Sequence, residues 1–497
     1  MKNFKRKLFG LCVIMLSTVF SCQLTEDIDD FKPLYSLEAE NAIVDETSAE
    51  NALNGAYAKY SQIAFSTISR GLMSGDIIVG GYYNRFPEIE GWSLNNPPSN
   101  VDRFTLNDYS SMYSSINNCN WLLQEIAKLD ASEFSTPERK DEIIGEAKLL
   151  RANTHFKLLQ SFGQFYDMSS TFGIDVRFEP AISDKALPRK TVAETYAAIL
   201  QDINDGIAMA PDLRGGVKGY VNKSFGKGLK AKILLYMGDY SEAASIATDL
   251  INTGGSNFAL NPTHDGIFFP KNSQALFIHP EILFGIMGTP DAKSSLYIGP
   301  NIEGGFFGWD PYNVLTAVNG SMDVNGQSIN FDGNRFETLF TPSSIYVPRK
   351  YSTNLSTETH EMWIQLRMAE VYLILAEADA RANNAVTTVA LNALNAVRTR
   401  AGATTTGTDG FETYPASISL DQFLKAVRIE KQIELYLETG ESWFDLVRYD
   451  FIDGFGTGFQ VSDVKPSATN PEKFILPIPI KSVEASGGVT VQNPSYE

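Results

Sequence analysis

Cysteine and histidine are scarce in this chain. Its 497 residues include three cysteines and four histidines. Cys12 and Cys22 lie near the N-terminus, which leaves Cys119 alone in the body of the chain. A single cysteine forms no internal disulfide, and the scattered histidines show no H-E-x-x-H spacing for zinc. The composition therefore argues against a disulfide-rich fold and a metal centre, and we expect no cofactor.

Basic residues and long apolar runs are also in short supply. The chain has 41 basic against 59 acidic residues, a net charge of −18. Such a surface repels phosphate backbones, so nucleic acid is not an expected partner. No G-x-x-x-x-G-K-[ST] loop is present, and the S-x-x-K spacing at Ser224–Lys227 lacks its companion motifs. Beyond the N-terminus no stretch is apolar enough for a transmembrane helix.

The first 21 residues have the pattern of an export signal. Residues 1–7 are basic, residues 8–20 are almost wholly apolar, and Ser21 precedes Cys22. This resembles a bacterial lipoprotein signal, so we expect cleavage before Cys22 and lipidation of that residue. Plain secretion and an uncleaved anchor are the alternatives. The acidic residues at 26–30 resemble an address for the outer face of the outer membrane, as in lipoproteins of the Bacteroidetes.

The body of the chain has helical periodicity with clear start signals. Capping patterns begin at Thr47, Ser135, Thr191 and Ser419. The segments expected to be helical are 47–64, 112–129, 135–162, 191–210, 227–237, 240–251, 362–382, 388–400 and 419–437. The fold is therefore predicted to be mainly α.

One helix pair resembles a tetratricopeptide hairpin. In residues 235–243, Gly238 permits a tight turn, a tyrosine sits between the helices and Ala243 lets them approach. One such unit cannot bury its apolar face alone, so about four pairs are expected to stack. The candidates are 112–162, 191–209 with 225–251, 363–400 and 420–450. An ordinary helical hairpin is the alternative.

Two stretches depart from this helical pattern. Residues of about 70–110 and 254–361 are rich in Gly, Pro, Asn and aromatic side chains, and 276–287 is expected to be extended. We therefore expect residues 1–21 as the signal and 22–497 as one domain. Its helical scaffold would cover about 40–70, 110–253 and 362–450, with the two loop-rich inserts between these parts.

Ordered sequence blocks along the chain resemble SusD/RagB-type outer-membrane nutrient-binding lipoproteins of the Bacteroidetes. The blocks are E-A-K-L-L-R-A at 146–152, L-R-M-A-E-V-Y-L-I-L-A-E-A at 366–378, L-N-A-V-R-T-R-A-G at 394–402, R-I-E-K-Q-I-E-L at 428–435, W-F-D-L-V-R at 443–448, P-I-P at 477–479 and Q-N-P-S-Y at 492–496. The chain departs from the usual pattern at 438–443, which is one residue longer and lacks an arginine.

The charged residues of these blocks are interpreted as structural. They stand at helical spacings among apolar residues, where buried charges are tolerated when they are paired. We expect them to join one helix to another. They are Arg151, Glu370, Glu377, Arg398, Glu430, Glu434, Asp445 and Arg448. No catalytic residue is assigned.

The resemblance implies four tetratricopeptide-like helix pairs that carry an irregular ligand-binding lobe. It also implies a surface lipoprotein that binds an oligosaccharide and acts as a lid on a SusC-like TonB-dependent transporter in the outer membrane. Peptide or another nutrient is the alternative ligand. A protein-binding helical scaffold and a glycoside hydrolase are further alternatives.

Aromatic side chains in the two inserts are the candidate ligand-binding groups. Sugar rings stack on indole and phenol rings, while their hydroxyl groups need polar partners nearby. Trp92 and Trp309 are the leading candidates because each is flanked by glycine and polar residues. The others are Tyr82, Tyr83, Asn84, Arg85, Asp76 and Tyr312. About half of the aromatic residues in these loops are expected to pack against the body instead.

Overall fold

The structure, a computed structural model, separates residues 1–44 from a compact unit of residues 45–497. It describes residues 42–63, 66–79, 86–181, 186–268, 277–287, 307–310, 313–333, 335–336, 340–341, 347–348, 362–405 and 410–496. The expected signal and Cys22 lie outside these residues. Within them, no helix combines the length and apolarity that crossing a bilayer requires.

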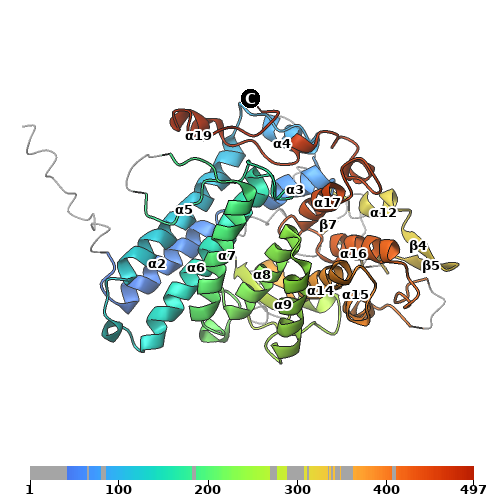
Figure 1. The fold of residues 1–497 in the computed structure, drawn as a ribbon, viewed down its shortest axis with the longest axis horizontal. Helices are drawn as coiled ribbons and strands as arrows, with labels where there is room; N and C mark the ends of the chain where they lie inside the picture. Colours follow the sequence, from blue (N-terminus) through green and yellow to red (C-terminus); the bar gives the residue numbers. More distant parts are fainter. Residues whose placement is uncertain are drawn as a thin grey trace, which may run out of the picture. The chain divides into compact units, whose positions relative to one another are not determined.

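Helices dominate the compact unit, as predicted (Figure 1). The longer ones are α2 (Glu46–Tyr60), α3 (Ser66–Ser74), α5 (Arg103–Ile126), α6 (Pro137–Phe162), α7 (Val192–Met209), α8 (Lys223–Met237), α9 (Tyr240–Thr253), α14 (Met368–Asn383), α15 (Thr388–Arg400), α16 (Leu420–Glu434) and α17 (Glu441–Ile452). Shorter ones are α4 (Pro87–Ser93), α12 (Asn313–Ala317), α18 (Val461–Val464) and α19 (Ile480–Ala485).

The predicted helix pairs are confirmed by the packing. Helix α5 packs on α6, α7 on α8, α8 on α9, α14 on α15, and α16 on α17. Successive pairs also contact one another, since α6 packs along α7 and α9 packs along α14 (Figure 1). Each pair thus buries its apolar face against the next, as stacked helical repeats require.

Glycine sets the geometry at two of these contacts. Gly238 ends α8 with a left-handed φ of 85°, and α9 begins at Tyr240, which confirms the predicted tight turn. At Gly145 of α6, an added Cβ would lie 2.1 Å from the backbone nitrogen of Ala210, just beyond α7. Any larger residue at 145 would therefore push these helices apart.

Capping explains most of the helix starts. Thr191 with Glu194 and Ser419 with Gln422 form the predicted capping boxes, and the hydroxyl of Thr136 accepts from the backbone of Arg139. The first helix differs from the prediction, because Asp45 is its N-cap and forms a capping box with Ser48.

The strands form four two-stranded antiparallel sheets among the described residues. The pairs are β1 (Ile77–Val79) with β3 (Phe307–Trp309), β2 (Ile282–Met287) with β8 (Met362–Arg367), β4 (Ser321–Val324) with β5 (Gln327–Asn330), and β6 (Phe340–Thr341) with β7 (Val347–Pro348). Strand β2 confirms the extended chain expected at its position.

The prediction of helix for residues 362–367 was wrong. These residues form β8, and α14 begins only at Met368. All six side chains of β8 are buried, and the strand pairs with β2, some 80 residues earlier. A run buried on both faces carries no two-residue alternation, so its sequence looks like the start of the helix that follows.

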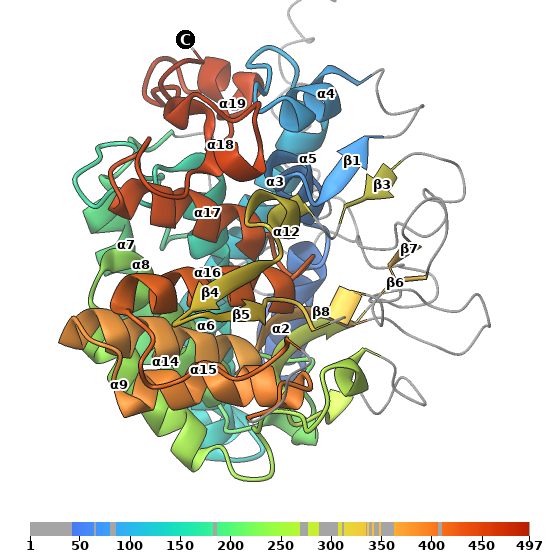
Figure 2. The ribbon, with the colours of Figure 1, turned by 90° about the vertical axis from the view of Figure 1, so that its right-hand side faces the viewer.

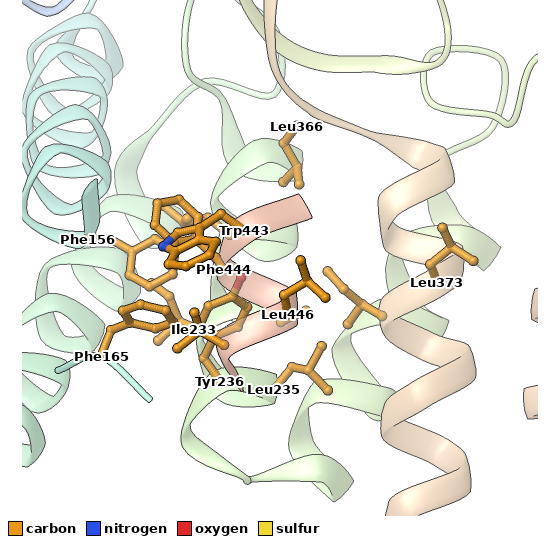
Figure 3. Close-up of a cluster of buried hydrophobic side chains, with 14 of the residues drawn as sticks. Phe156, Phe165, Ile233, Leu235, Tyr236, Leu366, Leu373, Trp443, Phe444 and Leu446 are labelled. Carbon is orange, nitrogen blue, oxygen red and sulfur yellow. The ribbon is translucent and has the colours of Figure 1, made fainter. Parts of the chain in front are cut away.

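The largest core cluster of the described residues runs through the helical scaffold and includes the place where α6, α8, α14 and α17 meet. Figure 3 shows the indole of Trp443 beside Phe156 and Phe444, with Tyr236 below and Leu373 on the facing helix. All of these side chains are buried. The indole nitrogen donates to the carbonyl of Phe474 at 3.0 Å, so this large side chain leaves no polar group unpaired.

Buried ion pairs confirm the structural role predicted for the charged motif residues. Both nitrogens of the Arg448 fork lie 2.7 Å from the Glu377 carboxylate, which joins α17 to α14. Arg151 makes the same kind of double contact with Asp202, at 2.7 Å for each bond, and joins α6 to α7. Two-point contacts of this kind fix direction as well as distance.

A dense group of buried charges surrounds Glu434 at the end of α16. Its carboxylate accepts from Arg367 at 2.6 Å and from Arg400. Arg367 also contacts Glu281 at 2.6 Å and Glu438 at 2.8 Å. These side chains are at most 4% exposed. This group, the Glu434 network, joins α16, β8 and α15 with the residue that precedes β2.

Loss of Arg367 should be strongly destabilising. Arg367→Met would leave three buried carboxylates short of a partner, and removal of one member of a buried pair costs about 3–5 kcal/mol. Urea unfolding would measure this. Lys227→Met is the matched control, because the Lys227–Asp249 pair is 37% and 51% exposed and should contribute less than about 1 kcal/mol. Equal effects of the two substitutions would contradict the assigned role.

Low pH should remove the contribution of Glu434 to the stability of the fold. Burial alone would raise the pKa of this carboxyl, but Arg400 and Arg367 overcome that effect and hold the pKa well below its ordinary value. Because the folded pKa lies below the unfolded pKa, the stabilisation is complete above the ordinary carboxyl pKa and is lost as the pH falls further. The stability gap between the wild type and Glu434→Gln should therefore narrow from pH 6 to pH 3 in denaturant titrations. A gap independent of pH would contradict this.

Candidate functional site

The two loop-rich inserts meet in one two-stranded ribbon. Strand β1 of the first insert pairs antiparallel with β3 of the second, with Ile77 opposite Trp309 and Val79 opposite Phe307. Figure 2 shows these strands side by side at one edge of the molecule, on the side where β6 and β7 also lie. We call this pair the β1–β3 ribbon. It joins segments 230 residues apart in the chain.

The register of the ribbon shows which predicted site residues lie near the same end of the ribbon in the sequence. Val79 lies opposite Phe307, so the chain leaves β1 at the same end where it enters β3. The residues that directly follow β1 include four of the predicted site residues. Tyr82, Tyr83, Asn84 and Arg85 lie outside the described residues, as does Tyr312. For Trp309 the structure describes only the backbone, which belongs to β3.

Asp76 stands at the opposite end of the ribbon and is buried. Its carbonyl accepts from the Tyr436 hydroxyl at 2.7 Å and from the backbone of Asp310 at 3.0 Å. Burial raises the pKa of the Asp76 carboxyl to about 7, while hydrogen bonds from Ser442 and Ser74 act in the opposite direction. The backbone of Asp76 therefore anchors this end of the ribbon, and the contact between its side chain and a ligand stays a prediction.

The corner between α16 and α17 holds the ribbon in place. Tyr436, which lies in this corner, and Ser442, in the first turn of α17, both contact Asp76. Leu437 and Thr439 in the same corner adopt left-handed φ angles of 62° and 47°, which cost about 1 kcal/mol or more for residues other than glycine. This corner includes part of residues 438–443, where the chain is one residue longer than the SusD/RagB-type pattern. The strained backbone is held in place because Glu438, between these two residues, accepts a hydrogen bond from Arg367 of the Glu434 network.

Trp92 does not lie on a surface, which corrects the expectation of an exposed indole. It is 1% exposed and packs against Phe104 with ring centres 6.2 Å apart. Phe86 also contacts Phe104, at 5.6 Å, and the Arg103 guanidinium covers both phenylalanines. Trp92 shares the buried face of the short helix α4 with Ile89, and so short a helix shows little periodicity in a sequence.

Two polar residues of the first insert also form hydrogen bonds within the fold. The amide of Asn95 donates to the carbonyl of Met73 at 3.0 Å, and its oxygen accepts from Ser467 at 2.7 Å. The side chain of Asn96 accepts from Lys473. These amides therefore fix the base of the insert against the C-terminal part of the chain.

Exposed apolar side chains near the ribbon were missed in the sequence. Ile78, the middle residue of β1, is 50% exposed, and Leu94, just after α4, is 55% exposed. The signal that could have identified Ile78 is the alternation of a strand, since its neighbour Ile77 is buried. In the part of the chain that the structure describes, no three His, Cys, Asp or Glu side chains are arranged to hold a metal.

Comparison with protein families accounts for most of the chain. Residues 33–235 match a family model described as "Starch-binding associating with outer membrane", of SusD-like type. Residues 315–496 match the SusD family model. The two matches together cover both halves of the helical scaffold. The chain is a SusD-like protein.

Solved structures show the same fold. A SusD superfamily protein from Bacteroides thetaiotaomicron aligns with a TM-score of 0.71 at 21% identity, over 91% of this chain and 100% of that one. A putative sugar binding protein from Bacteroides vulgatus gives 0.69 at 23% identity, over 92% and 100%. Surface glycan-binding protein A from Bacteroides uniformis gives 0.68 at 19% identity, over 91% and 100%. No curated protein matches the chain.

Asp76 should make stability depend on pH near neutrality. Its folded pKa lies above the ordinary value of 3.8, so its contribution is complete at low pH and is lost as the pH rises through about 7. Asp76→Asn cannot ionise, and should gain roughly 1–3 kcal/mol relative to the wild type between pH 5 and pH 8. Urea unfolding at both pH values measures this. Asp212→Asn, at a site 90% exposed, is the control and should show no such gain. An equal difference in the free energy of unfolding between Asp76→Asn and the wild type at pH 5 and pH 8 would contradict the assigned effect of burial.

Proposed function

We propose that this chain is a surface-exposed, non-enzymatic glycan-binding lipoprotein. It captures an oligosaccharide on its loop-bearing side and delivers it to a SusC-like TonB-dependent transporter in the outer membrane. The observation that carries the proposal is the β1–β3 ribbon, which joins the two aromatic-rich inserts in one place. The description of the matched family model, starch-binding and outer-membrane associated, supports the same ligand class and location.

The chemistry of the segments beside the ribbon suits a carbohydrate. Tyr82 and Tyr83 follow β1 within four residues, and Trp309 ends β3. Aromatic rings offer flat apolar faces to the C–H groups of sugar rings, and Asn84 and Arg85 supply polar groups for the hydroxyls. The exposed Ile78 adds apolar surface on the ribbon itself.

A lipid anchor at Cys22 would hold the protein at the membrane. Acyl chains contribute about 0.8 kcal/mol for each buried CH₂ group, so several chains on one residue retain a protein without a spanning helix. The net charge of −18 gives no electrostatic attraction to anionic headgroups, which leaves the lipid as the anchor. A transporter in the same membrane would then lie within reach of the bound glycan.

A purely binding role fits the use of charge in the fold. The carboxylates of the family motifs are engaged in buried ion pairs, as Glu377 is with Arg448 and Glu434 is with Arg367. A glycoside hydrolase needs two carboxyl groups that converge on the substrate. We therefore expect binding without release of new reducing ends.

The direct test is a binding screen of residues 23–497, which include the whole compact unit, against polysaccharides and peptides. Binding to a glycan should be lost, by about tenfold or more, in the triple variant Tyr82→Ala/Tyr83→Ala/Trp309→Ala. Trp121→Ala is the matched control, because Trp121 is a half-buried indole on α5 and should leave binding unchanged. Circular dichroism confirms that each variant is folded.

Other outcomes would contradict the proposal in distinct ways. Binding to peptides alone would replace the ligand class and keep the uptake role. Equal glycan binding by the triple variant and the wild type would show that the glycan site is not at the ribbon. Turnover of the bound glycan would make the protein an enzyme, and no binding across the panel would favour a protein-binding scaffold.

A further inference from the structure

An open cleft lies on α5, and no residue of the β1–β3 ribbon is among those that line it. Its volume is about 470 Å³, within the range of about 300–1,000 Å³ that small-ligand sites occupy. One wall is α5, a second is the segment around Asp175 and Arg177, and the third is the C-terminal stretch from Ser482 to Thr490. In Figure 2, α19, which begins this stretch, lies at the top of the molecule to the left of α4, while β1 and β3 lie to the right.

The α5 wall of the cleft is aromatic. Tyr109 and Tyr113 are successive half-buried residues on one helix face, with ring centres 4.8 Å apart. Phe162 of α6 packs edge-on against Tyr109 at 5.0 Å and fixes its ring. The Arg177 guanidinium lies over the ring of Tyr113 at 5.7 Å. The cleft therefore has a rigid aromatic wall with a polar edge.

The polar groups that adjoin the tyrosines are balanced in charge. Arg177 pairs with Asp175 at 2.8 Å, and the Tyr113 hydroxyl donates to the Asp175 carboxylate and, at 3.1 Å, to its carbonyl. The side chain of Asn120 donates to the Arg177 carbonyl at 3.2 Å and accepts from Arg151 at 2.6 Å. These bonds hold the polar groups in place before any ligand arrives, which reduces the cost of binding.

From this arrangement we infer that the cleft is a second binding site, for a neutral mono- or disaccharide. The inference rests on the proposed function for its ligand class. The adjacent rings of Tyr109 and Tyr113 offer apolar faces that suit a sugar ring, and paired donors and acceptors suit its hydroxyl groups. A charged ligand is disfavoured because Asp175 and Arg177, the carboxylate and the guanidinium among the described residues that line the cleft, neutralise each other. An apolar ligand would leave these polar groups unpaired.

Isothermal titration of residues 23–497 with neutral disaccharides (maltose, cellobiose, laminaribiose, xylobiose and mannobiose) tests the inference. Ser482→Trp places an indole in the mouth of the cleft from a half-buried position and should weaken binding of at least one disaccharide by about tenfold or more. Asp175→Asn, which removes the charge of the carboxylate, should also weaken it. Lys481→Trp is the matched control, since Lys481 is exposed on the same helix and does not line the cleft. It should bind as the wild type does.

The triple variant of the ribbon separates this inference from the proposed function. Disaccharide binding that survives in the triple variant and is lost in Ser482→Trp supports a second site. Disaccharide binding lost in the triple variant and kept in Ser482→Trp would overturn it. Polysaccharide binding without any disaccharide binding would overturn the second site and leave the proposed function intact. Binding of glutamate or glucuronate in place of neutral sugars, lost in Ser482→Trp, would overturn the ligand class.

Discussion

The buried ion pairs around Glu434 are the constraint on which much of the structure depends. One carboxylate at the end of α16 gathers arginines from β8 and α15, and Arg367 in turn holds Glu281 before β2. Such charges are stabilising only while all their partners are present. The network therefore specifies one mutual arrangement of the scaffold helices and the β2–β8 sheet, beyond what apolar packing requires.

The same corner of the chain transmits this rigidity to the loop-bearing side. Glu438 belongs to the Glu434 network, and Tyr436, two residues earlier, donates to the carbonyl of Asp76 at the base of β1. The left-handed backbone of Leu437 and Thr439 is maintained between these contacts. A rigid scaffold thus positions a short ribbon.

The scaffold was largely predictable because its signals are local. Capping residues such as Thr191 and Ser419, the turn at Gly238 and the helical spacing of charges all lie within a few residues of one another. The candidate site was predictable only in part. Pairing of Ile77 with Trp309 spans the chain, so sequence named both inserts as candidates without showing that they meet. Burial of Trp92 depends on Phe104, which lies in another helix. Likewise, the cleft joins Tyr113 to partners far along the chain.

Hydrogen exchange of the backbone, measured with and without the bound glycan, tests the central claim most directly. The account predicts new protection in peptides that contain β1, β3 and the segments beside them. The Glu434 network should exchange slowly in both states, because it is fixed before the ligand binds. Protection confined to the scaffold helices, with β1 and β3 unchanged, would contradict the claim that the ribbon carries the ligand site.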